Sequence, residues 1–330
     1  MYVILDWVAN HTAWDNEMKF NHPQWYERDY KGDFTSTPWY DWADIIDLDF
    51  NQPELRQYMA KAMRYWVEDI GIDGYRCDAA GLVPLQFWTD VRHELEQIKP
   101  VFMLAEWEGK EFHEQAFDAT YAWSWWQAVH DIAQGKKDVN ALYNYYSWNT
   151  GYYPPMSMRL TYISNHDVNA WEATQFEAFA DALPAAIVLS VVGEGLPMIY
   201  NGQEAGNAKR LEFFERDPIN WQPHPIGDLY QQVFTLKKQN SVLWNGKWGA
   251  PMQHVPNNQA NQVLSFVRQN QQQKLFAVFN FSAQPQKVRF AESLYHGNYV
   301  EYFTQTQKSL SSETELTLAP WSYRVFVAGK

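Results

Sequence analysis

Three carboxylates of this 330-residue sequence lie where short apolar runs end. Asp78 ends the run DGYRCD, Glu106 ends VFMLAE, and Asp167 follows RLTYIS after two polar residues. An acid after a strand often caps the next helix or faces solvent, so a single one predicts little. In a parallel β/α fold, however, the carboxyl ends of the strands meet on one face, where reactive groups collect. The joint placement of the three acids therefore predicts one site of carboxylate chemistry.

Other polar residues accompany these acids at the same strand ends. Arg76 lies two residues before Asp78, so on a strand both side chains point the same way. Its fixed positive charge would keep Asp78 ionised. By itself, a histidine at such a position is more often structural than catalytic. The remaining members of the set are Asp6, Asn10, His11, Asn165 and His166.

The elements that would position these residues alternate along the first 240 residues. Short apolar runs typical of buried strands alternate with longer segments in which apolar residues recur at helical spacing. The predicted strands cover 2–7, 73–78, 101–106, 118–123, 159–164 and 196–201. The predicted helices cover 53–71, 84–98, 125–134, 138–148, 177–192 and 228–240. This repeat is typical of an α/β fold with a parallel sheet.

Two stretches depart from this repeat. Residues 12–50 form a long irregular connection, and connections of that length are usually functional. After about residue 245, short strands alternate with Gln- and Asn-rich turns, which predicts a small antiparallel β-sandwich. The sequence thus predicts a β/α domain over 1–240 and a β-sandwich domain over 241–330.

Composition excludes several kinds of partner. A net charge of -13 repels phosphate backbones and anionic lipid surfaces, so nucleic acid is not expected as a partner. The longest apolar run, at 185–193, is far shorter than the roughly 20 residues of a membrane span. Cys77 is the single cysteine, which excludes an internal disulfide. Many of the 17 Trp, 20 Tyr and 19 Phe lie in polar stretches, which favours a surface that handles sugars. Composition predicts neither the compartment nor the oligomeric state.

Four motifs in order resemble the signature regions of the α-amylase family, glycoside hydrolase family 13. They are DWVANH at 6–11, GIDGYRCDAA at 71–80, LAEWE at 104–108 and YISNHD at 162–167. The segment GLPMIYNGQEAG at 195–206 is similar to that family's eighth barrel strand. The resemblance implies a TIM (β/α)8 barrel followed by a C-terminal β-sandwich, with 12–50 as a short domain-B-like loop. Because the family's DWVANH-like motif ends the third barrel strand, the chain is expected to lack the first two β/α units.

The resemblance also implies roles for the site residues. Asp78 would be the nucleophile, Glu106 the general acid and base, and Asp167 the acid that stabilises the transition state. A retaining glycosidase needs two such carboxyl groups about 5 Å apart. Crowded by two other carboxylates, Glu106 is expected to hold its proton near neutral pH. Sugar contacts are expected from His11, Arg76, Trp107, Asn165 and His166, and structural support from Asp6 and Asn10.

The implied reaction is hydrolysis of α-1,4-glucosidic bonds in starch, glycogen or maltooligosaccharides. Two alternatives stay open: a glucan transferase or sugar isomerase of the same family, and a non-catalytic carbohydrate-binding or interaction protein. No cofactor is required; the resemblance allows a calcium ion with Asn10 as one ligand. The family commonly has Lys-His three and four residues after the nucleophile. This chain has Gly81 and Leu82 there, so binding on the leaving-group side is expected to differ.

Overall fold

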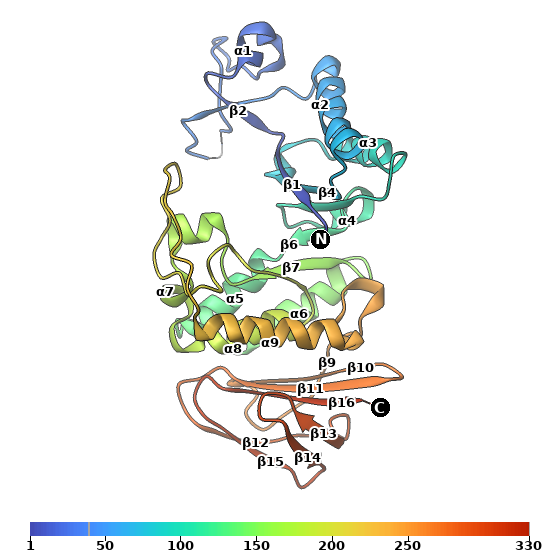
Figure 1. The fold of residues 1–330 in the computed structure, drawn as a ribbon, viewed down its shortest axis with the longest axis vertical. Helices are drawn as coiled ribbons and strands as arrows, with labels where there is room; N and C mark the ends of the chain where they lie inside the picture. Colours follow the sequence, from blue (N-terminus) through green and yellow to red (C-terminus); the bar gives the residue numbers. More distant parts are fainter. Residues whose placement is uncertain (39, 330) are drawn as a thin grey trace. The chain divides into compact units, whose positions relative to one another are not determined.

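The computed structural model describes residues 1–38 and 40–329, which Figure 1 traces from end to end. The chain divides into two units, Met1–Tyr121 and Ala122–Lys330, and each is described in its own terms. This division differs from the predicted boundary at residue 240. The second unit contains the end of the β/α part as well as the antiparallel strands. All six predicted parallel strands are present, four in the first unit and two in the second.

The first unit is built on parallel strands in the order β1-β4-β5-β6. Their bounds are Ile4–Val8, Gly74–Asp78, Phe102–Ala105 and Ala119–Tyr121. The helices α2 (Pro53–Tyr65), α3 (Leu85–Glu96) and α4 (Lys110–Gln115) follow strands or connections of this unit. Pro53 occupies the first turn of α2, where its missing N–H costs nothing. The predicted helix 53–71 continues beyond α2 as a π turn, Trp66–Ile70, and ends at Gly71 in a left-handed conformation.

The irregular segment after β1 is ordered by a small hairpin of its own. Strand β2 (His11–Ala13) pairs antiparallel with β3 (Ile45–Asp47), and the short helix α1 (Glu17–Asn21) is capped by Asn16. Trp25 and Tyr26 between them are buried in the core of the first unit. The segment is therefore packed through its aromatic side chains.

The second unit begins with helices α5 (Trp123–Ala133) and α6 (Asn140–Tyr152) and the parallel pair β7 (Met158–Tyr162) and β8 (Leu196–Met198). The predicted helix 177–192 is wrong as a single helix. It is divided into α7 (Gln175–Phe179), a 3-10 turn at Ala180–Ala182 and α8 (Leu183–Val192). Pro184 in the first turn of α8 cannot donate a backbone hydrogen bond, which separates the two helices. Helix α9 (Pro225–Gln239) ends this part.

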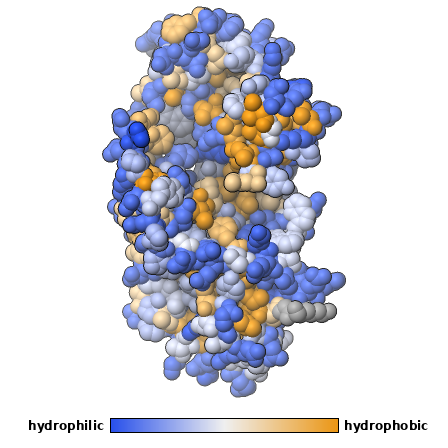
Figure 2. Space-filling view, viewed as in Figure 1, coloured by the Kyte–Doolittle hydropathy of each residue, from blue (hydrophilic) through white to orange (hydrophobic). Residues whose placement is uncertain are grey.

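Residues 175–192 also have the length and hydropathy that a membrane-spanning helix requires. Of this stretch, 72% is buried inside the protein, and every residue of α8 except Pro184 is buried. Burial of this kind is typical of a core helix. Figure 2 shows a face covered mainly by hydrophilic residues with smaller hydrophobic patches.

The C-terminal strands form the predicted sandwich of antiparallel sheets. The larger sheet has the order β14-β13-β16-β11-β10-β9, and β12 pairs with β15 in the smaller one. In chain order these strands are Gln253–His254, Val263–Gln269, Gln273–Asn280, Gln286–Arg289, Gly297–Glu301, Thr306–Leu310, Glu315–Leu318 and Tyr323–Gly329. The sequence did not predict β14, whose residues TQKSL are exposed except for the last and lack apolar alternation.

Lys237 of α9 joins β8 to the turn that follows the helix. Its ammonium group donates to the carbonyl of Gly195 at 3.4 Å, to Asn245 Oδ1 at 3.1 Å and to the carbonyl of Leu243. Burial, together with the positive charge of Arg268, lowers the pKa of Lys237 from 10.5 to about 7.

Close approach between β4 and β5 requires Gly74. A Cβ atom at this position would lie 1.9 Å from the carbonyl oxygen of Phe102. We expect Gly74→Ala to destabilise the protein by about 3 kcal/mol or more, because β5 must move away. Gly151→Ala in α6, where a Cβ meets nothing within 4 Å, is the control and should be neutral or slightly stabilising. Thermal unfolding measures both; equal melting temperatures would contradict the prediction.

The lowered pKa of Lys237 predicts a pH-dependent stability. Unfolding returns the ammonium to water, where its pKa is about 10.4. Between about pH 7 and pH 10 the unfolded chain therefore binds more protons, and stability rises with pH by at most about 1.4 kcal/mol per unit. Lys237→Met removes this gain. The free energy of unfolding of the wild type minus that of the variant, both measured by urea unfolding, should therefore increase from pH 7 to pH 9. Lys238 is exposed and serves as the control. For Lys238→Met, the same difference in unfolding free energy should not change between pH 7 and pH 9.

Candidate active site

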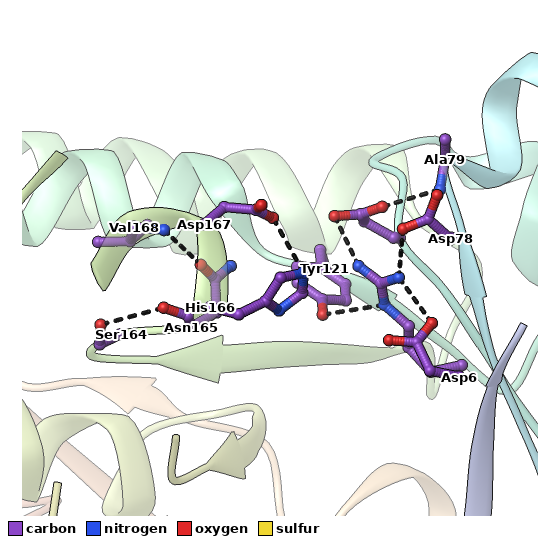
Figure 3. A network of polar contacts seen from close by, with 11 residues as sticks. Asp6, Asp78, Ala79, Tyr121, Ser164, Asn165, His166, Asp167 and Val168 are labelled. Atoms are coloured by element: carbon purple, nitrogen blue, oxygen red, sulfur yellow. Dashed lines mark hydrogen bonds and ion pairs between the residues drawn. The ribbon is translucent and has the colours of Figure 1, made fainter. Parts of the chain in front are cut away.

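One arginine holds the acids of the first unit together. The guanidinium of Arg76, on β4, contacts Asp78 Oδ1 and Asp6 Oδ1 through Nη1, at 2.6 and 2.8 Å. Its Nη2 lies 2.8 Å from Glu106 Oε1. Figure 3 shows these contacts together with Tyr121, whose hydroxyl accepts from Arg76 Nε at 3.4 Å. Three carboxylates and a phenol thus surround one buried cation.

The strand register explains this arrangement. In the parallel pairs, Asp6 on β1 lies opposite Arg76, and Asp78 ends the same strand two residues later. Glu106 follows β5, and its N–H donates to the carbonyl of Cys77 at 3.0 Å, which continues the ladder between β4 and β5. The predicted alignment of Arg76 with Asp78 on one face of the strand agrees with their 2.6 Å contact.

Charge around Arg76 is strongly negative. Burial opposes its positive charge, but Tyr121, Glu106, Asp6 and Asp78 together raise the pKa of Arg76 above its usual range. Burial raises the pKa of Tyr121 to about 12, although Arg76 opposes this shift. Arg76 is therefore charged at any pH at which the protein is folded.

The surroundings of Glu106 differ from the prediction. Only carboxylates were expected beside it, whereas one of its oxygens contacts Arg76 and the other accepts from the N–H of Ala79 at 2.8 Å. Both contacts stabilise a negative charge on Glu106. Ala79 itself has a φ of 42°, a left-handed conformation that non-glycine residues rarely adopt. This strained backbone presents its N–H to the site.

Trp107 lies against Gly81, one of the two positions at which the chain departs from the motif that it resembles. A Cβ atom on Gly81 would lie 2.0 Å from the Trp107 indole, so a side chain cannot occupy this position while Trp107 keeps its place. Trp107 also packs against the core of the first unit. Its predicted contact with sugar stays a prediction.

Asn10 and His11 belong to the hairpin after β1. The Asn10 amide donates to Asp47 Oδ1 at 3.1 Å and to Thr37 Oγ1 at 3.3 Å, and Thr37 donates in turn to Asp47. Burial raises the pKa of Asp47, while Thr37, His11 and Asn10 oppose the shift. The His11 ring lies 5.7 Å from that of Trp42. Asn10 is thus part of a buried hydrogen-bond network.

Asn10 is also the residue predicted to bind calcium. Among residues 1–38 and 40–329, no three His, Cys, Asp or Glu side chains are grouped so that they could hold one metal ion. The Asn10 amide and the Asp47 carboxylate are already hydrogen-bonded to each other. Calcium with Asn10 as one ligand stays a prediction.

The second unit carries the remaining predicted residues directly after β7. Asn165 is buried, and its Oδ1 accepts from the N–H of Val168 at 2.7 Å. His166 Nε2 lies 3.4 Å from Asp167 Oδ2, and both side chains are partly exposed (Figure 3). The negative charge of Asp167 adds to the burial that raises the pKa of Tyr200. That Asp167 joins Asp78 and Glu106 in one site stays a prediction, since it belongs to the other unit.

Sequence reasoning missed several members of these networks. Tyr121 could have been found, because it is a polar residue near the end of a predicted strand. Asp47 also ends a short apolar run, IID, although it lies in the segment predicted to be irregular. The Ala79 N–H and the Thr37 hydroxyl could not have been found from the sequence, because no motif or spacing distinguishes these two residues from other alanines and threonines.

Comparisons with known proteins agree with these features. Residues 1–239 match the family model of the α-amylase catalytic domain, and residues 252–325 match that of the maltogenic amylase C-terminal domain. Alpha-amylase 2 of Dictyoglomus thermophilum is 24% identical over 308 residues, which are 84% of this chain and 52% of that protein. A cyclomaltodextrinase of a Bacillus species is 24% identical over 272 residues, 76% of this chain and 46% of that protein. The chain thus spans about half the length of these relatives.

Two crystal structures have the same fold. The maltogenic α-amylase AmyB from Thermotoga neapolitana superposes with a TM-score of 0.87 at 26% identity, covering 100% of this chain and 78% of that one. An α-amylase from Lactobacillus plantarum superposes with a TM-score of 0.84 at 26% identity, covering 99% of this chain and 78% of that one. The TIM-barrel fold with six of its strands present, and the C-terminal β-sandwich, are thereby confirmed. As its four motifs indicated, the chain belongs to the α-amylase family, glycoside hydrolase family 13.

Proposed function

We propose that the protein is a retaining glycosidase that hydrolyses α-1,4-glucosidic bonds of starch, glycogen or maltooligosaccharides. The observation that carries this proposal is the contact of one guanidinium with both Asp78 and Glu106. Two carboxyl groups held on neighbouring nitrogens of one guanidinium lie near each other, and the double displacement of a retaining glycosidase requires such a pair, separated by about 5 Å.

In the first step, Asp78 attacks the anomeric carbon while Glu106, in its protonated form, gives its proton to the departing glycosidic oxygen. An ester bond forms between the sugar and Asp78, and the glycosidic bond breaks. In the second step, Glu106 takes a proton from water, the water oxygen attacks the anomeric carbon, and Asp78 leaves as a carboxylate. Asp167 is assigned to hold sugar hydroxyls through both steps.

Arg76 couples the charge of Asp78 to the protonation of Glu106 during this cycle. Esterification removes the negative charge of Asp78, so the guanidinium then interacts mainly with Asp6 and Glu106. That change favours the ionised form of Glu106 when it must act as a base. Return of the charge to Asp78 weakens the hold on Glu106, which favours its reprotonation.

Transfer to a sugar acceptor is the second candidate, because it uses the same intermediate. One relative, 25% identical over 221 residues, is a cyclomaltodextrin glucanotransferase of Geobacillus stearothermophilus. Chromatography of the products from maltoheptaose separates the two reactions, since only transfer gives chains longer than seven units. A sugar isomerase would change the linkage without changing the length. A purely sugar-binding protein would give no product.

Removal of either reacting carboxylate should abolish turnover. We expect Asp78→Asn and Glu106→Gln each to lower kcat on maltoheptaose by about a thousandfold or more, because nucleophile and proton donor have no substitutes. Asp90→Asn, on the exposed side of α3, is the control and should keep full activity. Circular dichroism and melting temperature check that each variant folds. Activity within tenfold of wild type in either variant would refute the assignment.

Asp6 should set the pH range of the reaction without touching the sugar. We expect Asp6→Asn to move the basic limb of the kcat/KM profile to lower pH by about half a unit to one unit. Loss of one carboxylate leaves more of the Arg76 charge to stabilise ionised Glu106, so the proton needed for the first step is lost sooner. A purely structural role would lower activity at all pH values and leave the limb where it is.

A further inference from the structure

Three large aromatic side chains lie exposed near Asp167, and the proposed reaction does not use them. Trp171, Phe213 and Phe214 are 59%, 43% and 71% exposed. The ring centroid of Phe213 lies 5.1 Å from that of Trp171 and 5.0 Å from that of Phe214. We call these three rings the aromatic platform. A contiguous group of exposed aromatic rings is typical of a binding surface.

His166 connects the platform to the predicted sugar contacts. Its ring lies 6.1 Å from that of Phe213, with 29° between the two planes. The Nε2 atom of the same ring lies 3.4 Å from Asp167 Oδ2. A ligand held by Asp167 and His166 would therefore meet Phe213 next, and then Trp171 and Phe214.

Buried and charged groups fix the platform in place. Trp171 lies in the turn Val168–Glu172, and the buried amide of Asn169 in that turn accepts from the N–H of Leu211 at 2.9 Å. The same amide donates to the carbonyl of Lys209 at 3.3 Å. Asn169 thus ties the turn that carries Trp171 to the segment that carries Phe213 and Phe214. Rings that are already held in position lose little entropy when a ligand binds.

Two ion pairs lie beside the platform. Lys209 pairs with Asp217, and Arg210 pairs with Glu177 of α7 at 3.1 Å. The pairing lowers the pKa of Asp217, and a hydrogen bond from the backbone of Thr174 together with Arg210 lowers that of Glu177. Both acids therefore stay ionised and neutralise their partners. A neutral ligand with apolar C–H faces and hydroxyl edges, such as a glucose unit, suits rings in such surroundings.

We propose that the aromatic platform is a subsite for the α-glucan chain, holding glucose units next to the unit that contacts His166 and Asp167. This inference rests on the proposed function, and it makes the enzyme selective for chains long enough to reach the platform.

The test compares long and short substrates. We expect Trp171→Ala, Phe213→Ala and Phe214→Ala each to lower kcat/KM for maltoheptaose about threefold to tenfold, the usual worth of one aromatic contact. For maltotriose the change should stay below about twofold. Trp148→Ala on α6 is the control. Trp148 is also exposed, by 65%, but its ring stacks on Tyr152, which is not part of the platform. All four variants should melt at the wild-type temperature, since the replaced rings are exposed.

A binding measurement separates this inference from the proposed reaction. Calorimetric titration of maltoheptaose into Glu106→Gln reports binding without turnover, and adding each platform substitution should weaken it by the same threefold to tenfold. If wild type cleaves maltoheptaose but the platform variants match it in both assays, the subsite is refuted and the proposed function stands. If Glu106→Gln does not bind maltoheptaose at all, the subsite is refuted whatever the reaction. A change in oligomeric state with unchanged glucan binding would instead make the platform a contact between copies of the chain.

Discussion

The buried guanidinium of Arg76 is the constraint on which the first unit's chemistry depends. A cation removed from water is stable only if charges of opposite sign replace its hydration. Asp6 does so from within β1, Asp78 from the end of β4 and Glu106 from the position after β5. Arg76 and the three carboxylates stabilise one another, so the register of β1, β4 and β5 and the placement of Asp78 and Glu106 depend on each other. A shift of one residue in any of these strands would turn an acid to the opposite face and leave the cation uncompensated.

The second unit uses a different device to keep its site in place. Here a buried amide, Asn169, binds the backbone of a distant segment, and two ion pairs lie beside that segment. Asn165 acts in a similar way, because its side chain caps the N–H of Val168. Amides fix geometry without adding charge, which suits the proposed surface for neutral sugar, whereas the reaction proposed for the first unit requires charge.

Much of this could be predicted because local pattern and chemistry agree. The six parallel strands are short apolar runs, and polar residues at their ends mark the site, so Asp78, Glu106 and Arg76 are visible in the sequence. The prediction was wrong where the information is not local. The break between α7 and α8 depends on Pro184 within an otherwise continuous apolar stretch, and β14 is recruited by pairing with β13 although its own residues are polar. The contact of Arg76 with Glu106 depends on how far apart two strands lie, which the sequence of neither strand contains.

Substitutions at positions 81 and 107 depend on each other. The indole occupies the space into which any side chain at position 81 would project. A larger residue at 81 is tolerated only after position 107 has become smaller, so the order of substitutions decides which sequences are accessible. A mutational scan of single positions would classify Gly81 as invariant, although the constraint comes from its neighbour. Redesign of this part of the first unit would therefore start at Trp107, and a library that varies both positions together would reach sequences that stepwise changes cannot.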